Sequence, residues 1–66
     1  MNVMVNGVDV ELAGPEPLDT LLADQDLARP GVAVALNGEV VPRSSWPTMQ
    51  VTEGDAIEVL TAAPGG

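Results

Sequence analysis

The sequence contains no cysteine and no histidine. Their absence excludes thiolate metal sites, iron–sulfur clusters, a cysteine nucleophile and any catalytic triad that relies on a histidine base. It also excludes disulfide bonds, so a chain of 66 residues must be stabilised by its hydrophobic core. A chain this short buries only about 60% of the surface that it exposes when unfolded. We therefore expect one small domain with no room for an enclosed active-site cleft.

Positive charge is nearly absent as well. Arg29 and Arg43 are the only cations against ten acidic residues, which gives a formal net charge of −8. Binding to nucleic acid or to an anionic membrane surface is disfavoured, because both require clustered cations. A partner with a basic surface is favoured, although an acidic surface also serves solubility alone. The sequence shows neither a signal peptide nor a membrane span, so we expect a cytoplasmic protein.

Two Asn-Gly pairs, at positions 6–7 and 37–38, each separate two apolar stretches. Such pairs favour type I′ turns, whose two central residues both have positive φ, and so they predict β-hairpins. The stretch 32–36 is nearly uninterrupted in its apolar residues, which is typical of a strand covered on much of both faces. The predicted strands contain Val3 and Val5, then Val8 to Leu12, Val32 to Leu36, and Glu39 to Val41, with Pro42 ending the last of them.

A short helix is predicted between the hairpins. Leu18, Leu21 and Leu22 have helical spacing, and Pro17 suits the first helical position because its missing N–H has no partner there. We expect this helix to end near Asp24. It is too short to persist alone, so its leucines must pack on the sheet.

The last third of the chain leads to a final strand. Residues 43–47 are expected to form a connector, with Trp46, the only aromatic residue, covering one end of the core. A tight turn at 52–55 precedes a strand from Ala56 to about Ala62. The predicted fold class is α+β, with one helix on one face of a mixed sheet. If the first and last strands are neighbours they run parallel, and the termini lie at opposite ends of the sheet.

Several of these features together resemble the ThiS family of sulfur carrier proteins in thiamine biosynthesis. The resemblance rests on the segment Asn37 to Arg43, on Trp46, on the segment Glu53 to Val59, and on the terminal Gly65-Gly66. It implies a β-grasp (ubiquitin-like) fold, with a mixed sheet of four to five strands packed on one short α-helix. The domain would span 1–62, and residues 63–66 would form a flexible tail ending in Gly-Gly.

The resemblance also implies how such a chain works. The carboxylate of Gly66 would be adenylated by a ThiF-like enzyme that uses ATP and magnesium. Sulfur from a sulfur donor enzyme would then give a thiocarboxylate, which passes its sulfur to a ThiG-like thiazole synthase. In this scheme the chain is a carrier and not an enzyme, it binds no metal or stable cofactor, and we expect a monomer.

Residues near the C-terminus are therefore the candidate site. Gly65 and Pro64 would thread into the activating partner, since glycine allows close backbone approach and proline stiffens the base of the tail. If Ile57 and Val59 face the helix, the outward residues of the last strand form an apolar patch among acidic groups. The candidate docking residues are Leu60, Ala62, Met4 and Glu58.

Three alternatives remain at this point. A MoaD-like small subunit of molybdopterin synthase, or a carrier for another sulfur metabolite, would share the fold and the Gly-Gly end. A ubiquitin-like protein modifier would instead form an amide through Gly66, and ladders of higher mass on immunoblots would reveal it. A plain interaction module would tolerate loss of Gly66.

Overall fold

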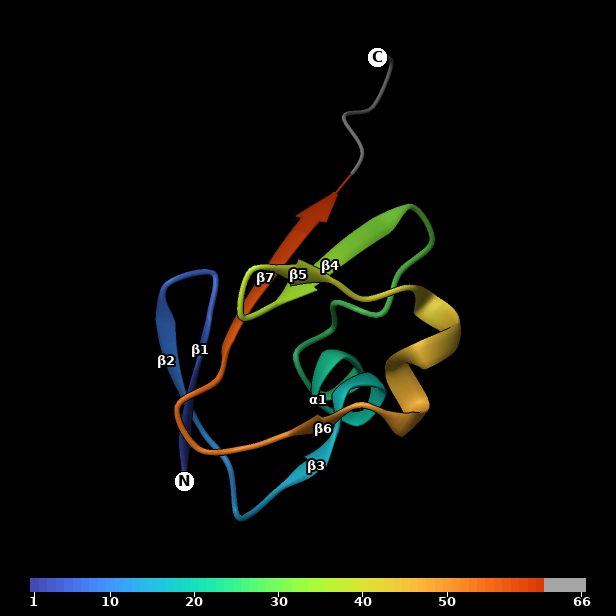
Figure 1. Cartoon of the computed structure of the whole chain (residues 1–66). Coiled ribbons are helices and arrows are strands. Elements are labelled where there is room, and N and C mark those ends of the chain that lie inside the picture. Colours follow the sequence, from blue (N-terminus) through green and yellow to red (C-terminus); the bar gives the residue numbers. More distant parts are fainter. Residues whose placement is uncertain (62–66) are drawn as a thin grey trace.

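Five strands form one mixed sheet in the computed structural model, which describes residues 1–61 (Figure 1). Their order across the sheet is β2-β1-β7-β4-β5, with β1 and β7 parallel and the other neighbours antiparallel. The predicted mixed sheet is confirmed, and so is the parallel pairing of the first strand with the last. The strands are β1 (Asn2–Val5), β2 (Val8–Glu11), β4 (Val32–Leu36), β5 (Glu39–Val40) and β7 (Ala56–Thr61).

The helix α1 (Leu18–Asp24) packs its leucines on one face of this sheet. Leu18, Leu21 and Leu22 are fully buried, as their spacing predicted, and the helix ends at the expected residue. Pro17 is the N-cap and not the first helical residue, because its backbone is extended. It belongs to β3 (Glu16–Pro17), which pairs with β6 (Gln50–Val51) in a second, two-stranded sheet that the sequence did not predict.

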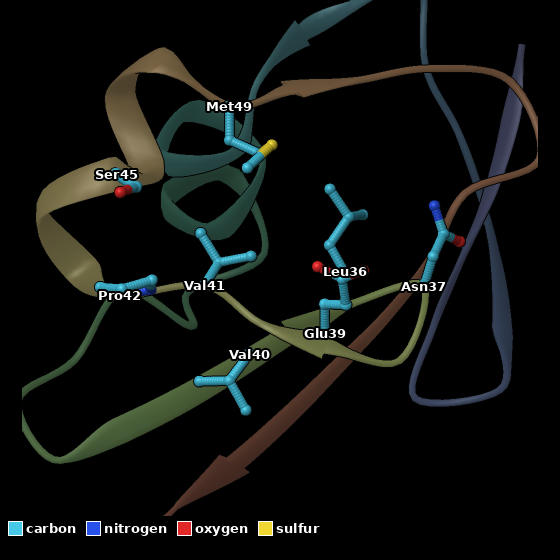
Figure 2. A pocket seen from close by; sticks show the side chains of 8 residues that line it. All are labelled: Leu36, Asn37, Glu39, Val40, Val41, Pro42, Ser45 and Met49. Carbon is cyan, nitrogen blue, oxygen red and sulfur yellow. The ribbon is translucent and has the colours of Figure 1, made fainter.

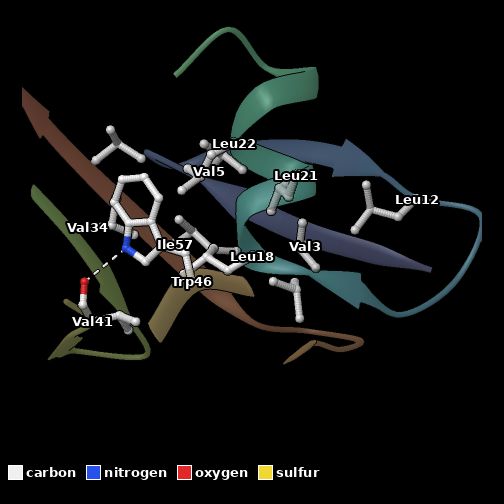
Figure 3. Close-up of a cluster of buried hydrophobic side chains, with 12 residues drawn as sticks. Val3, Val5, Leu12, Leu18, Leu21, Leu22, Val34, Val41, Trp46 and Ile57 are labelled. Carbon is white, nitrogen blue, oxygen red and sulfur yellow. Dashed lines mark hydrogen bonds between the residues drawn. The ribbon is translucent and has the colours of Figure 1, made fainter. Parts of the chain in front are cut away.

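The connector predicted after Pro42 is the 3-10 helix η1 (Arg43–Thr48), which contains Pro47 and buries Trp46. Trp46 is only 2% exposed, and its Nε1–H donates to the carbonyl oxygen of Val41 at 3.0 Å (Figure 3). The prediction that this side chain belongs to the core is confirmed.

Both Asn-Gly hairpins form as predicted, with positive φ at both residues of each pair. The expectation that the strand at 32–36 is covered on both faces is wrong. Val34 is buried, whereas Ala33 is exposed on the opposite face. Within residues 1–61 the helices α1 and η1 lie on one side of the sheet, as Figure 1 shows, and the small alanine side chains leave the other side open. No helix in this part of the chain is long and apolar enough to cross a membrane.

The turn before β7 is held by the carboxylate of Asp55. Its Oδ2 accepts from the backbone N–H of Thr52 at 2.8 Å, and its Oδ1 accepts from the side-chain amide of Asn37 at 3.0 Å. Partial burial tends to raise the pKa of Asp55, but the hydrogen bonds from Asn37 and Thr52 outweigh it and lower the pKa below the usual 3.8. The ionised carboxylate therefore stabilises the folded chain.

Asp55→Asn is expected to lower the urea midpoint at pH 7 and to make the urea midpoint less dependent on pH. Because the folded-state pKa is the lower one, this stabilisation is present above the unfolded pKa and is lost as the pH falls through the folded value. Urea unfolding of both chains at pH 7 and pH 3 measures the effect. Asp9→Asn, at an exposed strand position, is the matched control. If the urea midpoints of Asp55→Asn and the unchanged chain differed by the same amount at both pH values, the ionised carboxylate of Asp55 would not be the stabilising group.

Candidate functional site

The strand that leads to the C-terminus is the central strand of the five-stranded sheet. β7 pairs with β1 on one edge and with β4 on the other. Ile57 and Val59 are buried against the core, whereas Glu58 and Leu60 are exposed on the opposite face, as the alternation predicted. The end of β7 lies at the end of the sheet away from the N-terminus (Figure 1). A segment that follows β7 therefore continues from the central strand of the sheet.

Four of the predicted site residues lie outside the described part of the chain. They are Gly66, Gly65 and Pro64, proposed for sulfur loading and tail threading, and Ala62, proposed for docking. The three other docking residues are described, and all of them are on the open face of the sheet. Met4, on β1, is 37% exposed, and Leu60, on β7, is 67% exposed. Glu58 precedes Leu60 by two residues on β7 and is also exposed.

The strand register divides the predicted docking patch into two neighbouring hollows. Leu60 lies opposite Ala33, and Glu58 lies opposite Ala35. These four residues, with Val34 and Val40, line a small hollow of about 70 Å³. Met4 lies opposite Ala56. Ala56 precedes Leu60 by four residues, so Met4 and Leu60 are separated by roughly 13 Å along the strand direction. Met4 lines a second hollow, of about 500 Å³, together with Asn6, Gly7, Ala56, Ile57 and Glu58.

Sequence reasoning missed four members of the first hollow, which are Ala33, Val34, Ala35 and Val40. Val40 is the most exposed of the large apolar residues described, at 77%. Its neighbour Val41 is buried, and successive side chains of a strand point to opposite faces. The pair Val40-Val41 could therefore have shown that one valine faces outward. Ala33 could not have been found, because its place beside Leu60 depends on the register between β4 and β7.

A third hollow, of about 300 Å³, opens between β5 and η1 (Figure 2). The side chains of Leu36, Val41 and Met49 point toward it, while Val40 points to the other side of β5. Glu39 is the one ionisable residue among those that line it. General acid–base catalysis needs a positioned proton donor or acceptor in a partly buried site, usually with a second polar group. Glu39 is exposed, so this hollow offers no partly buried acid or base.

Both cations of the chain are engaged away from the open face of the sheet. Arg29 forms an ion pair with Asp26, with 2.7 Å between Nη2 and Oδ2. The guanidinium of Arg43 lies 4.4 Å from the ring centre of Trp46 and donates to the backbone oxygen of Arg29. The open face itself carries Glu58, and the register adds Asp9 beside Met4. The exposed apolar residues of the open face are therefore bordered by carboxylates. Across residues 1–61, no three His, Cys, Asp or Glu side chains are close enough together to hold a metal ion.

Comparison with known proteins gives full-length matches. The model of the ThiS family matches residues 3–66. The chain is 30% identical over 66 residues to the sulfur carrier protein ThiS of Escherichia coli, with all of both chains covered. It is also 30% identical to a segment making up 20% of a thiazole synthase from Paramagnetospirillum magneticum. The crystal structure of the thiamine biosynthesis protein ThiS from Geobacter metallireducens superposes with a TM-score of 0.86, at 36% identity and complete coverage of both chains. The predicted β-grasp fold is thereby confirmed.

Proposed function

The chain belongs to the ThiS family of sulfur carrier proteins in thiamine biosynthesis, and we propose that the Gly66 carboxylate is the group that carries the sulfur. The observation that supports this most strongly is the family match, which extends through Gly65-Gly66 to the last residue. The matches favour the thiamine branch over the molybdopterin alternative, because they name thiamine biosynthesis and thiazole synthase. The chain is a carrier and not an enzyme.

Loading of Gly66 takes two steps. A carboxylate oxygen attacks the α-phosphate of ATP on a ThiF-like adenylating enzyme, so that a P–O bond forms and pyrophosphate leaves. A sulfur at the oxidation level of sulfide, supplied by a sulfur donor enzyme, then attacks the acyl carbon. The C–S bond forms, AMP leaves with its oxygen, and a thiocarboxylate remains on Gly66. ATP and magnesium are bound by the activating partner in this scheme.

Glycine at the last two positions suits this chemistry. Without Cβ, Gly65 and Gly66 allow a partner's walls to approach the backbone closely and at any φ. The acyl carbon of Gly66 is unhindered for the incoming sulfur. A carboxylate at neutral pH is a poor acceptor, so the partner must supply positioning and stabilise the charge on the phosphate.

A ThiG-like thiazole synthase is the proposed recipient of the sulfur. The thiazole synthase of Paramagnetospirillum magneticum includes a segment similar to the whole of this chain. A carrier-like segment within such an enzyme favours direct transfer between the two. The C–S bond of the thiocarboxylate breaks as the sulfur passes to the synthase-bound substrate. An oxygen from that substrate or from water bonds to the acyl carbon in its place, so Gly66 returns to a carboxylate.

The open face of the sheet is the proposed docking surface for the adenylating partner. We define this surface by the residues Met4, Ala33, Val40, Glu58 and Leu60, and we add Ala62, which lies beyond the described residues. Exposed apolar groups of this extent often mark a partner surface. The nearby carboxylates favour a partner that presents aliphatic residues beside basic groups, since complementary charge steers the encounter.

Leu60→Glu is expected to raise the KM of the adenylating enzyme for the carrier about tenfold or more while leaving the domain folded. Leu60 is 67% exposed, so the new charge costs little in the free chain, but it must be desolvated in an apolar interface. Pyrophosphate release at varied carrier concentration gives KM, and circular dichroism checks the fold.

Val8→Glu is the matched control for this experiment. Val8 is a similarly exposed aliphatic residue, at 64%, but its register partner Val5 places it on the other face, at the edge strand β2. The two variants carry the same added charge. Equal KM values for Leu60→Glu and Val8→Glu would rule out the docking surface. No pyrophosphate release with the unchanged chain would count against the loading scheme itself.

A further inference from the structure

The side chain of Asn6 forms a two-point contact with the backbone of β7. Its Oδ1 accepts from the N–H of Val59 at 2.7 Å, and its Nδ2 donates to the carbonyl oxygen of the same residue at 3.3 Å. The two residues are 53 positions apart in the sequence. A side-chain amide thus pairs with a strand residue in the way that a neighbouring strand would.

This contact begins where the pairing of β1 with β7 ends. The last register pair is Val5 with Ile57, and the backbone N–H of Asn6 donates to the carbonyl oxygen of Ile57 at 2.9 Å. After that the chain turns away through Gly7, where φ is positive. The side chain of Asn6 takes the next position on the edge of β7, opposite Val59, and so extends the ladder by one residue after the backbone has left it.

Beyond Ile57 the described part of β7 has a strand partner on one edge only. Val59, Leu60 and Thr61 pair with β4, while β1 no longer reaches them. The side chain of Val59 packs in the core, and the amide of Asn6 supplies the hydrogen-bond partner on the edge of β7 that β1 has left. It acts directly before the segment that leads to Gly66.

We infer that Asn6 is a positioning residue for sulfur loading: its amide fixes the end of β7, and with it the direction in which the chain leaves the sheet toward the activating partner. This inference rests on the proposed function of Gly66. Fixing this end in the free chain reduces the conformational entropy that binding must otherwise remove. Loss of this contact should raise the KM of the adenylating enzyme for the carrier. It should change kcat little, because the enzyme itself holds the tail once the carrier is bound.

Asn37 offers a matched comparison at the other end of the same strand. It occupies the corresponding position of the second Asn-Gly turn, also with positive φ. Its Oδ1 accepts from the N–H of Ala56 at 2.9 Å, at the start of β7. Glycine adopts positive φ freely, so Asn6→Gly and Asn37→Gly both keep the turn and remove one amide. Only the first of them releases the end of β7 nearest to Gly66.

Amide hydrogen exchange of the isolated carrier tests the contact without any partner. Asn6→Gly should speed exchange of the Val59 N–H about tenfold, the effect of losing one hydrogen bond, while Glu58, paired with β4, changes less. Asn6→Asp keeps the acceptor for Val59 and should retain most of the protection. An unchanged Val59 rate in a folded Asn6→Gly chain would overturn the inference.

Steady-state adenylation tests the positioning role. Asn6→Gly should raise KM about five- to tenfold with little change in kcat, the cost of ordering about one residue. Asn37→Gly should leave KM near that of the unchanged chain even if its urea midpoint falls. Equal KM values for Asn6→Gly and the unchanged chain would overturn the inference while leaving the proposed function intact. If the unchanged chain is not adenylated, the proposed function fails, and the exchange rates still decide whether Asn6 holds β7.

Discussion

A chain without Gly66 is expected to lose its loading with sulfur almost completely. Removal of one residue shortens the reach of the terminal carboxylate by about 3.5 Å. Reacting atoms must come within about 3–3.5 Å of each other in productive geometry, and a displacement of only about 1 Å can cost a factor of about 100 in rate. The shortened chain still ends in a glycine carboxylate, so its chemistry is unchanged and only its position differs. We therefore expect a fall of at least about 100-fold in pyrophosphate release.

Growth provides the cellular measurement of the same prediction. A cell that lacks its own thiamine sulfur carrier should grow without thiamine when it expresses the full chain and should fail with the shortened one. Leu60→Glu serves as a comparison with an intact end, and excess expression should rescue it because its defect is in docking. Normal growth with the chain lacking Gly66 would contradict the carrier mechanism and favour the plain interaction module.

Trp46→Ala is expected to unfold most of the protein at room temperature. Trp46 is almost fully buried, and truncation of a buried aromatic residue typically costs about 3–5 kcal/mol. Domains have a free energy of unfolding of roughly 0.05–0.15 kcal/mol per residue, which leaves a chain of this length only a few kcal/mol in reserve. The variant also removes the hydrogen bond to Val41 and the surface against which Arg43 packs. Urea unfolding followed by far-ultraviolet circular dichroism measures the loss.

Trp46→Phe separates the hydrogen bond from the packing. It keeps an aromatic ring but leaves the carbonyl oxygen of Val41 without its side-chain donor, so a smaller loss of about 1–3 kcal/mol is expected. A Trp46→Ala chain with an unchanged urea midpoint would mean that this side chain does not hold η1 against the core.

The parts of the fold that local patterns specify could be predicted from the sequence. The Asn-Gly pairs gave both hairpins because few residues other than Asn and Gly accept two successive positive φ angles. The three leucines gave the buried face of α1, because their spacing matches the helical period. The sequence did not reveal η1 or the pairing of β3 with β6. A two-residue strand has no period to detect, and η1 depends on the burial of Trp46 in a core assembled from distant segments.

The candidate site divides in the same way. The proposal for Gly66 rests on resemblance to a family, and the outward direction of Leu60 follows from alternation along one strand. The placement of Ala33 beside Leu60, and of the Asn6 amide against Val59, depends on contacts between residues far apart in the chain. Asn6 has a sufficient local explanation as a turn residue, which hides its second role from any reading of the sequence.

Intact-mass analysis of the carrier tests the central claim most directly. The chain is incubated with a ThiF-like adenylating enzyme, ATP, magnesium and a sulfide source, and its C-terminal peptide is then sequenced by fragmentation. We predict a mass increase equal to the replacement of one oxygen by sulfur, confined to Gly66 and dependent on both ATP and the enzyme. An unchanged mass, or a covalent link from Gly66 to an amine of another protein in place of the sulfur, would contradict it.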